Sequence, residues 1–271
     1  MQSDFLAGIR VLVTRPAHQA QALCDMITEQ GGQAVRFPVI EIVPTPLSEE
    51  ATYWLRNPEK VDFAIFISAN AVQYGLAQLL AHGGIPDKLK LVTIGKASAE
   101  KVQQLLDRAP DIYPTEQYNS EALLALTELQ DDAVNNKQFI IFRGIGGREL
   151  LASTLQQRGA KVHYAEVYQR KLPKPDKEVL KRLQGLDSPD IVTVTSNEGL
   201  NNLVAMLHAH MEANQLEQFW QTPLVVVTEQ MRLNAQTAGF KDAIIVAARA
   251  SNEALLDSIQ KWCQSKPVDN R

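Results

Sequence analysis

The two halves of this chain carry the same landmarks at a fixed spacing, and this repeat constrains the fold more than any other feature. Residues 11–15 (VLVTR) resemble residues 139–143 (FIIFR), and EALL recurs at residues 121–124 and 253–256. The positions offset by 128 are Arg15 and Arg143, Gly31 and Gly159, Asp62 and Asp190, and Ser68 and Ser196. A shared α/β architecture would explain similar patterns but not a constant offset. We therefore predict a tandem duplication of a five-stranded α/β unit.

Short runs of Val, Ile and Leu alternate with segments of helical periodicity along the whole chain. We expect strands at residues 9–13, 34–37, 61–67, 89–94 and 111–113, and then at 139–142, 160–168, 191–195, 224–227 and 243–246. We expect helices at about residues 17–30, 69–82, 97–106, 120–129, 148–158, 197–210, 230–238 and 253–262. Apolar strands that alternate with helices predict parallel sheets covered by helices on both faces.

The composition excludes several classes of protein. The 271 residues suffice for about two domains, and with 45% hydrophobic residues the chain is too apolar to be disordered. No run approaches the ~18 consecutive apolar residues of a membrane-spanning helix, and the first residues lack a secretory-signal pattern, so we expect a cytoplasmic protein. The net charge of −4 argues against a nucleic-acid-binding surface, but it is compatible with a local basic site for a small anion.

The sequence contains no recognisable metal motif. Cys24 and Cys263 fall within predicted helices far apart in the chain, which excludes a disulfide framework and a multi-cysteine zinc site. His208 and His210 form the one close histidine pair, but residues two apart on a helix point to different faces. A P-loop, a zincin motif and a complete dinucleotide-binding fingerprint are also missing. A metal site is therefore not expected.

Polar and small residues follow the predicted strands, where the helices begin. In open parallel sheets, ligands bind outside the carboxyl ends of the strands, next to helix N-termini. These junctions supply backbone N–H groups, hydroxyls, amides and cations, which suit carboxylate or phosphate groups. The candidate residues are Arg15, Ser68, Asn70, Lys96, Ser98, Arg143, Gly144, Arg148, Ser196, Asn197 and Thr228.

Several of these residues also have an ordinary structural interpretation. Ser68, Ser196 and Thr228 are preferred helix N-caps, and capping is compatible with ligand contact through the same turn. Arg15 and Arg143 could equally form surface ion pairs, although their equivalence in the two repeats favours a functional role. No G-x-S-x-G elbow, Ser-His-Asp series or acid/base carboxylate pair is evident. The pattern indicates anion capture and shape more than a strong acid or nucleophile.

In their order and spacing, these segments resemble the uroporphyrinogen-III synthase family over essentially the whole chain. The matching segments are VLVTRP at 11–16, Gly31, PVIEI at 38–42, DFAIFISANAV at 62–72, IG at 94–95, Pro114, SEALL at 120–124, RGIGGR at 143–148, LxxxGAxV at 155–162, VYxR at 167–170 and TSN at 195–197. Two turns depart from the family's pattern. KAS at 96–98 replaces the usual Pro-Thr, and TEQMR at 228–232 is only loosely similar.

The resemblance implies a fold and a division into domains. The fold class is α/β, with two flavodoxin-like doubly wound parallel-sheet domains from a tandem duplication, joined by a two-stranded linker. The first domain would comprise residues 1–37 plus 174–271, and the second residues 40–170. Residues 38–46 and 170–175 would be the interdomain linkers, and the active site would lie in the cleft between the domains.

The resemblance also implies a reaction that needs no metal or organic cofactor. Linear hydroxymethylbilane loses water, its terminal pyrrole ring is inverted, and the macrocycle closes to uroporphyrinogen III. Tyr168 matches the tyrosine of the family's VYxR segment and would assist departure of the hydroxyl, as a phenol at the mouth of the cleft. The candidate residues above would hold the eight carboxylates of the substrate. We also expect a monomer, a transient hand-over of substrate from hydroxymethylbilane synthase, and no nucleic-acid or membrane partner.

Two other functions are compatible with the sequence. A two-domain clamp could bind a small anionic effector without catalysis, although no signal peptide supports a periplasmic version. A sugar-phosphate or nucleotide enzyme could use the same duplicated scaffold, since a fold does not fix a function. The missing phosphate-loop and metal motifs count against that second alternative.

Overall fold

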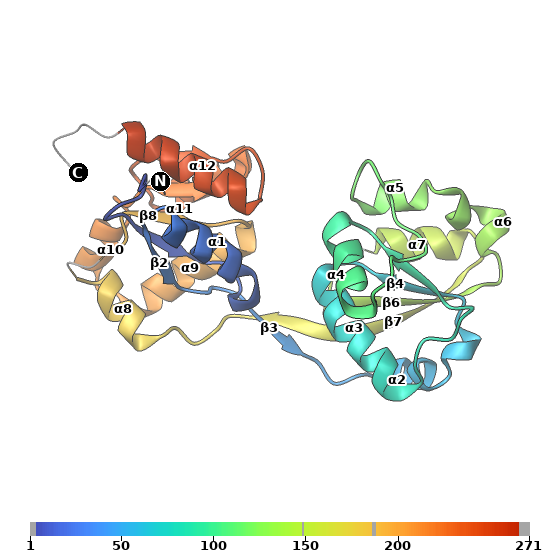
Figure 1. Ribbon diagram of the computed structural model, residues 1–271. Helices are drawn as coiled ribbons and strands as arrows, with labels where there is room; N and C mark the ends of the chain where they lie inside the picture. The colour runs from blue at the N-terminus through green and yellow to red at the C-terminus, as the bar shows by residue number, and fades with distance from the viewer. Residues whose placement is uncertain (1–3, 148, 186–187, 266–271) are drawn as a thin grey trace. The chain divides into compact units, whose positions relative to one another are not determined.

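The computed structural model describes residues 4–147, 149–185 and 188–265, and the chain divides into two compact units (Figure 1). Unit 1 spans residues 1–41 and 171–271, and unit 2 spans residues 42–170. Each unit contains one five-stranded sheet. The chain therefore starts in unit 1, builds the whole of unit 2, and returns to complete unit 1.

Unit 1 has a parallel sheet in the order β10-β9-β8-β1-β2. Its strands are β1 (Arg10–Val13), β2 (Gln33–Arg36), β8 (Ile191–Thr193), β9 (Leu224–Val226) and β10 (Ile244–Val246). The central strands β1, β8 and β9 are almost entirely buried, whereas the edge strands β2 and β10 keep exposed positions. This burial follows from the sequence, because consecutive apolar residues suit a strand covered on both faces.

Helices cover both faces of the sheet of unit 1. They are α1 (Ala17–Glu29), α8 (Lys177–Leu183), α9 (Asn197–His210), α10 (Ala213–Phe219), α11 (Glu229–Ala238) and α12 (Asn252–Ser265). On one face, Leu23 and Ile27 of α1 and Leu255 and Ile259 of α12 join Val11 of β1 in one buried cluster. Right-handed crossovers place α9 and α11 on the other face, since β8, β9 and β10 extend the sheet away from β2.

Unit 2 has a sheet in the order β3-β7-β6-β4-β5. Its strands are β3 (Glu41–Pro44), β4 (Phe63–Phe66), β5 (Lys90–Thr93), β6 (Gln138–Gly144) and β7 (Lys161–Lys171). Its helices are α2 (Glu49–Arg56), η1 (Pro58–Lys60), α3 (Ala69–His82), α4 (Lys96–Leu106), α5 (Ser120–Leu124), η2 (Thr127–Leu129), α6 (Asp131–Val134) and α7 (Leu150–Gln157). The helices α2, α3 and α4 lie on one side of the strands, and α5, α6 and α7 lie on the other (Figure 1).

Stacked aromatic pairs hold β4 against β6 in unit 2. Phe63 lies opposite Phe139 and Phe66 opposite Phe142 in the parallel register. The ring centroids of the two pairs are 4.4 Å and 4.7 Å apart, respectively. Such pairs contribute about 0.5–1.5 kcal/mol each beyond the area they bury. They fix the carboxyl ends of β4 and β6 next to each other.

The two repeats exchange strands between the units. Unit 1 takes β1 and β2 from the first repeat and β8, β9 and β10 from the second, whereas unit 2 takes β3, β4 and β5 from the first and β6 and β7 from the second. The pairing register is the same in both, with Arg10 opposite Gln33 and, 128 positions later, Gln138 opposite Lys161. In unit 1, β1 of the first repeat therefore pairs with β8 of the second. In unit 2, β6 of the second repeat pairs with β4 of the first.

The strand-start aspartates have equivalent structural roles. Asp190 Oδ2 accepts the backbone N–H of Arg10 at 2.8 Å, and Asp62 Oδ2 accepts that of Gln138 at 2.9 Å. Each carboxylate ties the start of its strand to the neighbouring strand. They lie at the amino ends of the strands, away from the predicted site.

The parallel-dominated sheets confirm the predicted α/β fold class. Two element predictions are wrong. Residues 111–113 form only an isolated bridge, between Ile112 and Val92. The helix predicted at 120–129 is broken into α5 and η2, because Gln130 Nε2 and Arg158 Nη1 both donate to the carbonyl of Leu124 and so replace helical donors there. The helices α2, α6, α8 and α10 were not predicted, since eight residues or fewer show little periodicity.

Candidate functional site

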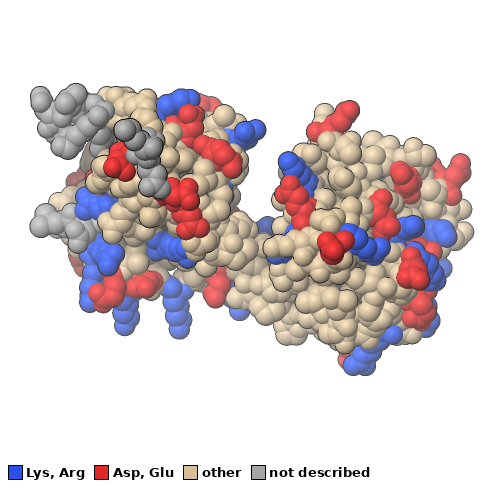
Figure 2. Space-filling model, viewed as in Figure 1, with Lys and Arg blue, Asp and Glu red and all other residues tan. Residues whose placement is uncertain are grey.

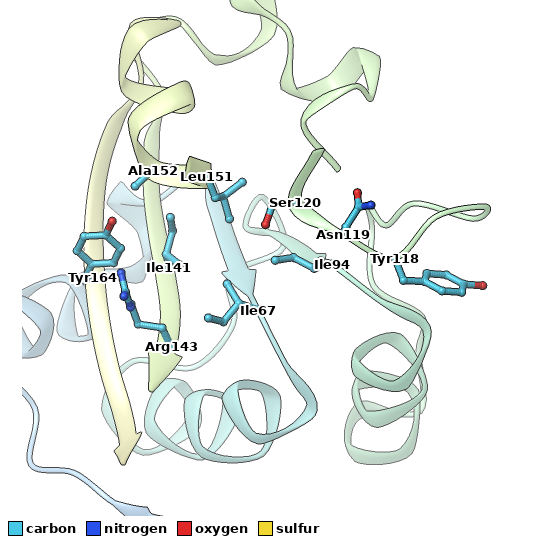
Figure 3. Close-up of a pocket in the computed structure, with 10 residues that line it drawn as sticks. All are labelled: Ile67, Ile94, Tyr118, Asn119, Ser120, Ile141, Arg143, Leu151, Ala152 and Tyr164. Atoms are coloured by element: carbon cyan, nitrogen blue, oxygen red, sulfur yellow. The ribbon is translucent and has the colours of Figure 1, made fainter. Parts of the chain in front are cut away.

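The carboxyl ends of β4, β5 and β6 border a pocket of about 300 Å³ in unit 2. In Figure 3, Arg143 and Tyr164 lie side by side on neighbouring strands, and Asn119 and Ser120 lie on the opposite side of the pocket. The lining residues are Ile67, Ile94, Tyr118, Asn119, Ser120, Ile141, Arg143, Leu151, Ala152 and Tyr164. This is the end of the sheet at which α/β proteins bind ligands.

Arg143 is the charged side chain among the pocket residues, and it is only 5% exposed. Its Nε donates to the carbonyl of Gly146 at 2.9 Å, and its Nη1 donates to Glu149 Oε1 at 3.0 Å. The guanidinium also lies over the ring of Tyr164, 4.7 Å from the centroid. The structure therefore shows Arg143 in an ion pair, one of the two roles that the sequence left open for it.

Tyr164 and Glu149 complete a three-residue network with Arg143. The hydroxyl of Tyr164 donates to Glu149 Oε2. Burial and this hydrogen bond raise the pKa of Tyr164 to about 12. The hydrogen bonds from Tyr164 and then Arg143 hold the pKa of Glu149 below its usual range. At neutral pH the network thus contains a neutral phenol, a carboxylate and a guanidinium.

Sequence reasoning missed Tyr164 and Glu149 as site residues. Two signals were available: Tyr164 lies on the strand predicted to follow Arg143, and Glu149 directly follows the RGIGGR segment. Had β6 been paired with β7 in the prediction, Tyr164 would have been placed near Arg143. For Glu149, the sequence offered no pairing that fixes its position in space.

Tyr168, the predicted catalytic residue, is buried with only 2% of its surface exposed. The expected phenol at an open mouth is therefore wrong for this structure. Its ring lies in the buried cluster on the α2–α4 side of the sheet and stacks on Tyr74, with centroids 6.0 Å apart. Its hydroxyl lies 3.1 Å from Ser68 Oγ. The phenol thus meets the N-terminal end of α3.

An irregularity in the pairing of β6 with β7 turns Tyr168 to that side. After Glu166, Val167 is passed over, and Tyr168 pairs with Gly144. In a regular strand Tyr164 and Tyr168 would face the same side, but here Tyr164 packs on the α5–α7 side instead. A Cβ at Gly144 would lie 2.7 Å from the ring of Tyr168, so this close approach requires glycine.

The turns after β4 and β5 contain the other predicted residues of unit 2. Ser68 Oγ accepts the backbone N–H three residues later at 3.0 Å as the N-cap of α3, and Asn70 is half-buried in the first turn. Lys96 Nζ is exposed, 3.7 Å from Glu100 Oε1, whereas Ser98 is buried. Arg148 lies outside the described residues.

Unit 1 holds its own arginine at the corresponding position. Arg15 donates to the carbonyl of Ala250 at 2.6 Å and, at 2.5 Å, to Oδ1 of Asn252, the first residue of α12. Burial lowers the pKa of Arg15, although nearby Glu253 opposes this shift. Two neutral oxygens therefore accept these hydrogen bonds from the guanidinium.

The remaining predicted residues of unit 1 also lie at helix N-termini. Ser196 and Thr228 cap α9 and α11, each accepting the N–H three residues later, at 3.0 Å and 3.2 Å. Asn197 Oδ1 accepts from Asn234 Nδ2 at 2.8 Å and so links the two helices. The predicted residues thus form two groups, with Ser68, Asn70, Lys96, Ser98, Arg143, Gly144 and Tyr168 in unit 2 and Arg15, Ser196, Asn197 and Thr228 in unit 1.

The chemistry available at these strand ends is anion capture. Guanidinium groups and helix N-termini favour carboxylates and phosphates. Among the described residues, no group of three or more His, Cys, Asp or Glu is placed to hold a metal ion. No helix in the described ranges is long and apolar enough to cross a membrane. On the face of each unit seen in Figure 2, Lys and Arg are interspersed with Asp and Glu.

The fold and the site define a class: two-unit α/β proteins with doubly wound sheets and arginine-bearing strand ends. A family model described as Uroporphyrinogen-III synthase HemD matches residues 21–257. The chain belongs to the uroporphyrinogen-III synthase family.

Relatives with this name cover both units. The chain is 34% identical to a uroporphyrinogen-III synthase of Salmonella typhimurium over 255 residues, which is 92% of this chain and 99% of that protein. It is 32% identical to that of Escherichia coli over the same shares of the two chains. The fold resembles that of uroporphyrinogen-III synthetase from Helicobacter pylori, with a TM-score of 0.57 and 16% identity over 94% of this chain and 99% of that one.

Proposed function

We propose that this protein is a cyclising lyase that converts hydroxymethylbilane into uroporphyrinogen III. The substrate loses water, its terminal pyrrole ring is inverted, and the macrocycle closes. The observation that carries the proposal is family membership across both units, with named relatives matched over 92% of the chain. The anion-binding character of the strand ends supports it, since the linear tetrapyrrole carries eight carboxylates.

The proposed chemistry depends on positioning more than on strong acids or bases. Departure of the hydroxyl leaves a cationic azafulvene, and attack at the substituted carbon of the last ring gives a spiro intermediate that fragments and recloses inverted. Uncatalysed closure gives the uninverted isomer, so the enzyme must hold the chain in the geometry that leads to inversion. A phenol can donate a hydrogen bond to the departing hydroxyl, and we assign this role to Tyr168.

The substrate carboxylates have candidate partners in each unit. The arginines Arg15, Arg143 and Arg148 would pair with acetate or propionate groups. Backbone N–H groups at the turns would add donors, through Ser68, Asn70, Ser196, Asn197 and Thr228, with Lys96, Ser98 and Gly144 nearby in the sequence. The pocket of about 300 Å³ is at the lower end of ligand-binding volumes, so it would take one ring of the substrate with its acid arms rather than the whole molecule.

The domain division that we propose is residues 1–37 plus 174–271 and residues 40–170, with linkers at 38–46 and 170–175. The division of the chain into two compact units after residues 41 and 170 supports it. Pro38 and Pro44 in the first linker and Pro173 and Pro175 in the second would favour extended chain there.

We further propose that the enzyme is a cytoplasmic monomer that receives its substrate directly from hydroxymethylbilane synthase. The support is chemical: a bilane that closes spontaneously to the wrong isomer must be captured soon after it forms. Light scattering of the purified protein tests the monomer, and co-sedimentation with that synthase during turnover tests the hand-over.

One assay tests the function itself. Freshly prepared hydroxymethylbilane is supplied, and the isomers of the oxidised product are separated by chromatography. We expect the product to shift from isomer I to isomer III. Isomer I at the rate of the enzyme-free reaction would contradict the proposal, and binding of the bilane without conversion would favour a clamp.

A further inference from the structure

We propose that the carboxylate of Glu149 occupies a site for anions formed by Arg143 and Tyr164 in unit 2, and that a carboxylate of the substrate displaces it on binding. The inference rests on the proposed function and adds to it a residue that lowers affinity. Glu149 would thereby tune how tightly Arg143 and Tyr164 hold the substrate and the product.

The contacts of Glu149 are those that a bound carboxylate ligand would make. Its Oε1 accepts from Arg143 Nη1 at 3.0 Å, and its Oε2 accepts from the hydroxyl of Tyr164. The same two donors line the pocket. One carboxylate thus uses a guanidinium and a phenol together, one oxygen for each donor.

The burial of the two partners is strongly unequal. The side chain of Glu149 is 65% exposed, whereas that of Arg143 is 5% exposed. A carboxylate that already faces water can leave at little cost in solvation. A buried guanidinium left without an anion is costly, so another anion must take the place of Glu149. The arrangement therefore favours exchange of one carboxylate for another over an empty site.

The side chain of Glu149 does not act as a helix cap. Glu149 is at the N-cap position of α7, but its side chain makes no capping hydrogen bond. Gly146 and Gly147, shortly before it, have φ of +75° and +117°. Glycines give the segment conformational freedom near the point where the carboxylate would swing away.

Unit 1 shows the same contact without the carboxylate. Gln21 and Arg36 stand 128 positions before Glu149 and Tyr164, and Arg36 Nη2 donates to Gln21 Oε1. The repeat has therefore kept a hydrogen bond between these positions, but only unit 2 places a negative charge there beside the first-strand arginine. The hydrogen bond alone does not require an acid at position 149.

The test is Glu149→Gln, which keeps the shape and removes the charge. The assay measures KM for hydroxymethylbilane and the inhibition constant of uroporphyrinogen III. We expect both constants to fall by about two- to five-fold, the range that a partly exposed ion pair can supply. Glu217→Gln is the matched control, since Glu217 is also exposed and ion-paired, with Lys241 at 2.9 Å, and lies in unit 1. We expect it to leave both constants unchanged.

A second measurement does not depend on turnover. The probe is a monopyrrole bearing one acetate and one propionate, and its dissociation constant is measured by NMR titration. We expect Glu149→Gln to bind it two- to five-fold more tightly than the unaltered protein, again by about the strength of one exposed ion pair. Equal or weaker binding, with KM unchanged or raised, would overturn the inference and leave Glu149 a purely structural residue. Failure of the proposed function would instead appear as no isomer III from the unaltered protein.

Discussion

The two units hold their first-strand arginines in different ways. In unit 1, Arg15 donates to the neutral oxygens of Ala250 and Asn252, at the start of the last helix. In unit 2, Arg143 donates to the carboxylate of Glu149 and is much more deeply buried. The first strands pair in the same register in both sheets, so the difference comes from the segments that supply the partners of each arginine. The two repeats therefore share the position of the arginine but differ in the groups that accept its hydrogen bonds.

A second difference concerns the side chain that packs against the residue after the arginine. Unit 2 has Tyr168 against Gly144, with its hydroxyl at Ser68. The positions 128 earlier in the chain are Ile40 and Pro16, which cannot provide a phenol or the room for one. If Tyr168 assists departure of the hydroxyl as proposed, the chemical step belongs to unit 2, because only that unit has this phenol.

The largest effect is expected for Tyr168→Phe, which tests whether the chemical step belongs to unit 2. Loss of the donor to the departing hydroxyl should lower kcat about 100-fold with little change in KM. Tyr74→Phe is the control, since it removes a phenol hydroxyl from the same unit, one that donates to the carbonyl of Ile42 at 3.2 Å. Steady-state kinetics with isomer analysis make the measurement. An unchanged kcat for Tyr168→Phe would remove Tyr168 from the mechanism.

The next effect is expected for Gly144→Ala. The new Cβ would lie 2.7 Å from one carbon of the Tyr168 ring and 2.8 Å from another, so the ring must move. Overpacking of this kind costs about 1–3 kcal/mol of unfolding free energy, and displacement of the phenol should lower kcat about tenfold. Urea unfolding and kinetics measure the two effects.

Gly95→Ala is the matched control for Gly144→Ala. Its Cβ would meet Tyr118 at 3.5 Å, an ordinary contact, so we expect only the loss of about 0.5–1 kcal/mol that Ala causes at the N-cap of α4. Equal stability of the two variants would show that Tyr168 has room to move and that its position is not fixed by Gly144.

The Gly144→Ala prediction depends on a contact that the sequence did not reveal. The alternation of strands and helices, the paired arginines and the caps Ser68 and Ser196 were predictable, because each depends on local pattern or on the repeat. The side to which Tyr168 points depends on one passed-over residue in the pairing of β6 with β7. Strict alternation along β7 puts Tyr168 on the opposite side, so only the tertiary register could reveal its place.

The partner of Arg143 was unpredictable for a related reason. Glu149 reaches it across a glycine-bearing turn whose backbone angles no local pattern specifies. Periodicity also does not reveal the exchange of strands between the repeats. The same ten predicted strands are equally compatible with two sheets that each contain the strands of one repeat. Burial of Ser98, one of the predicted site residues, likewise depends on packing of α4 rather than on its place in a turn.

A smaller effect compares the two N-caps. Ser68→Ala and Ser196→Ala should each cost about 1 kcal/mol of unfolding free energy, because each removes one capping hydrogen bond. Ser68→Ala should cost about 0.5–1 kcal/mol more, since the buried hydroxyl of Tyr168 also loses its partner. A double-mutant cycle with Tyr168→Phe isolates that extra amount. Equal costs for the two serines would mean that the Ser68–Tyr168 hydrogen bond contributes nothing to stability.

The smallest effect is confined to alkaline pH and to unit 2. The pKa of Tyr164 is about 12 in the folded protein and about 10 when unfolded. Between these values the unfolded chain has lost the phenol proton and the folded chain still holds it, so the unfolding free energy falls as pH rises. Unit 1 has Arg36 at the equivalent position and so lacks this phenol. Tyr164→Phe should therefore flatten the decline, as measured by urea unfolding between about pH 9 and pH 12. An unaltered decline would place the titrating group elsewhere and show that the network around Arg143 does not hold the proton of Tyr164.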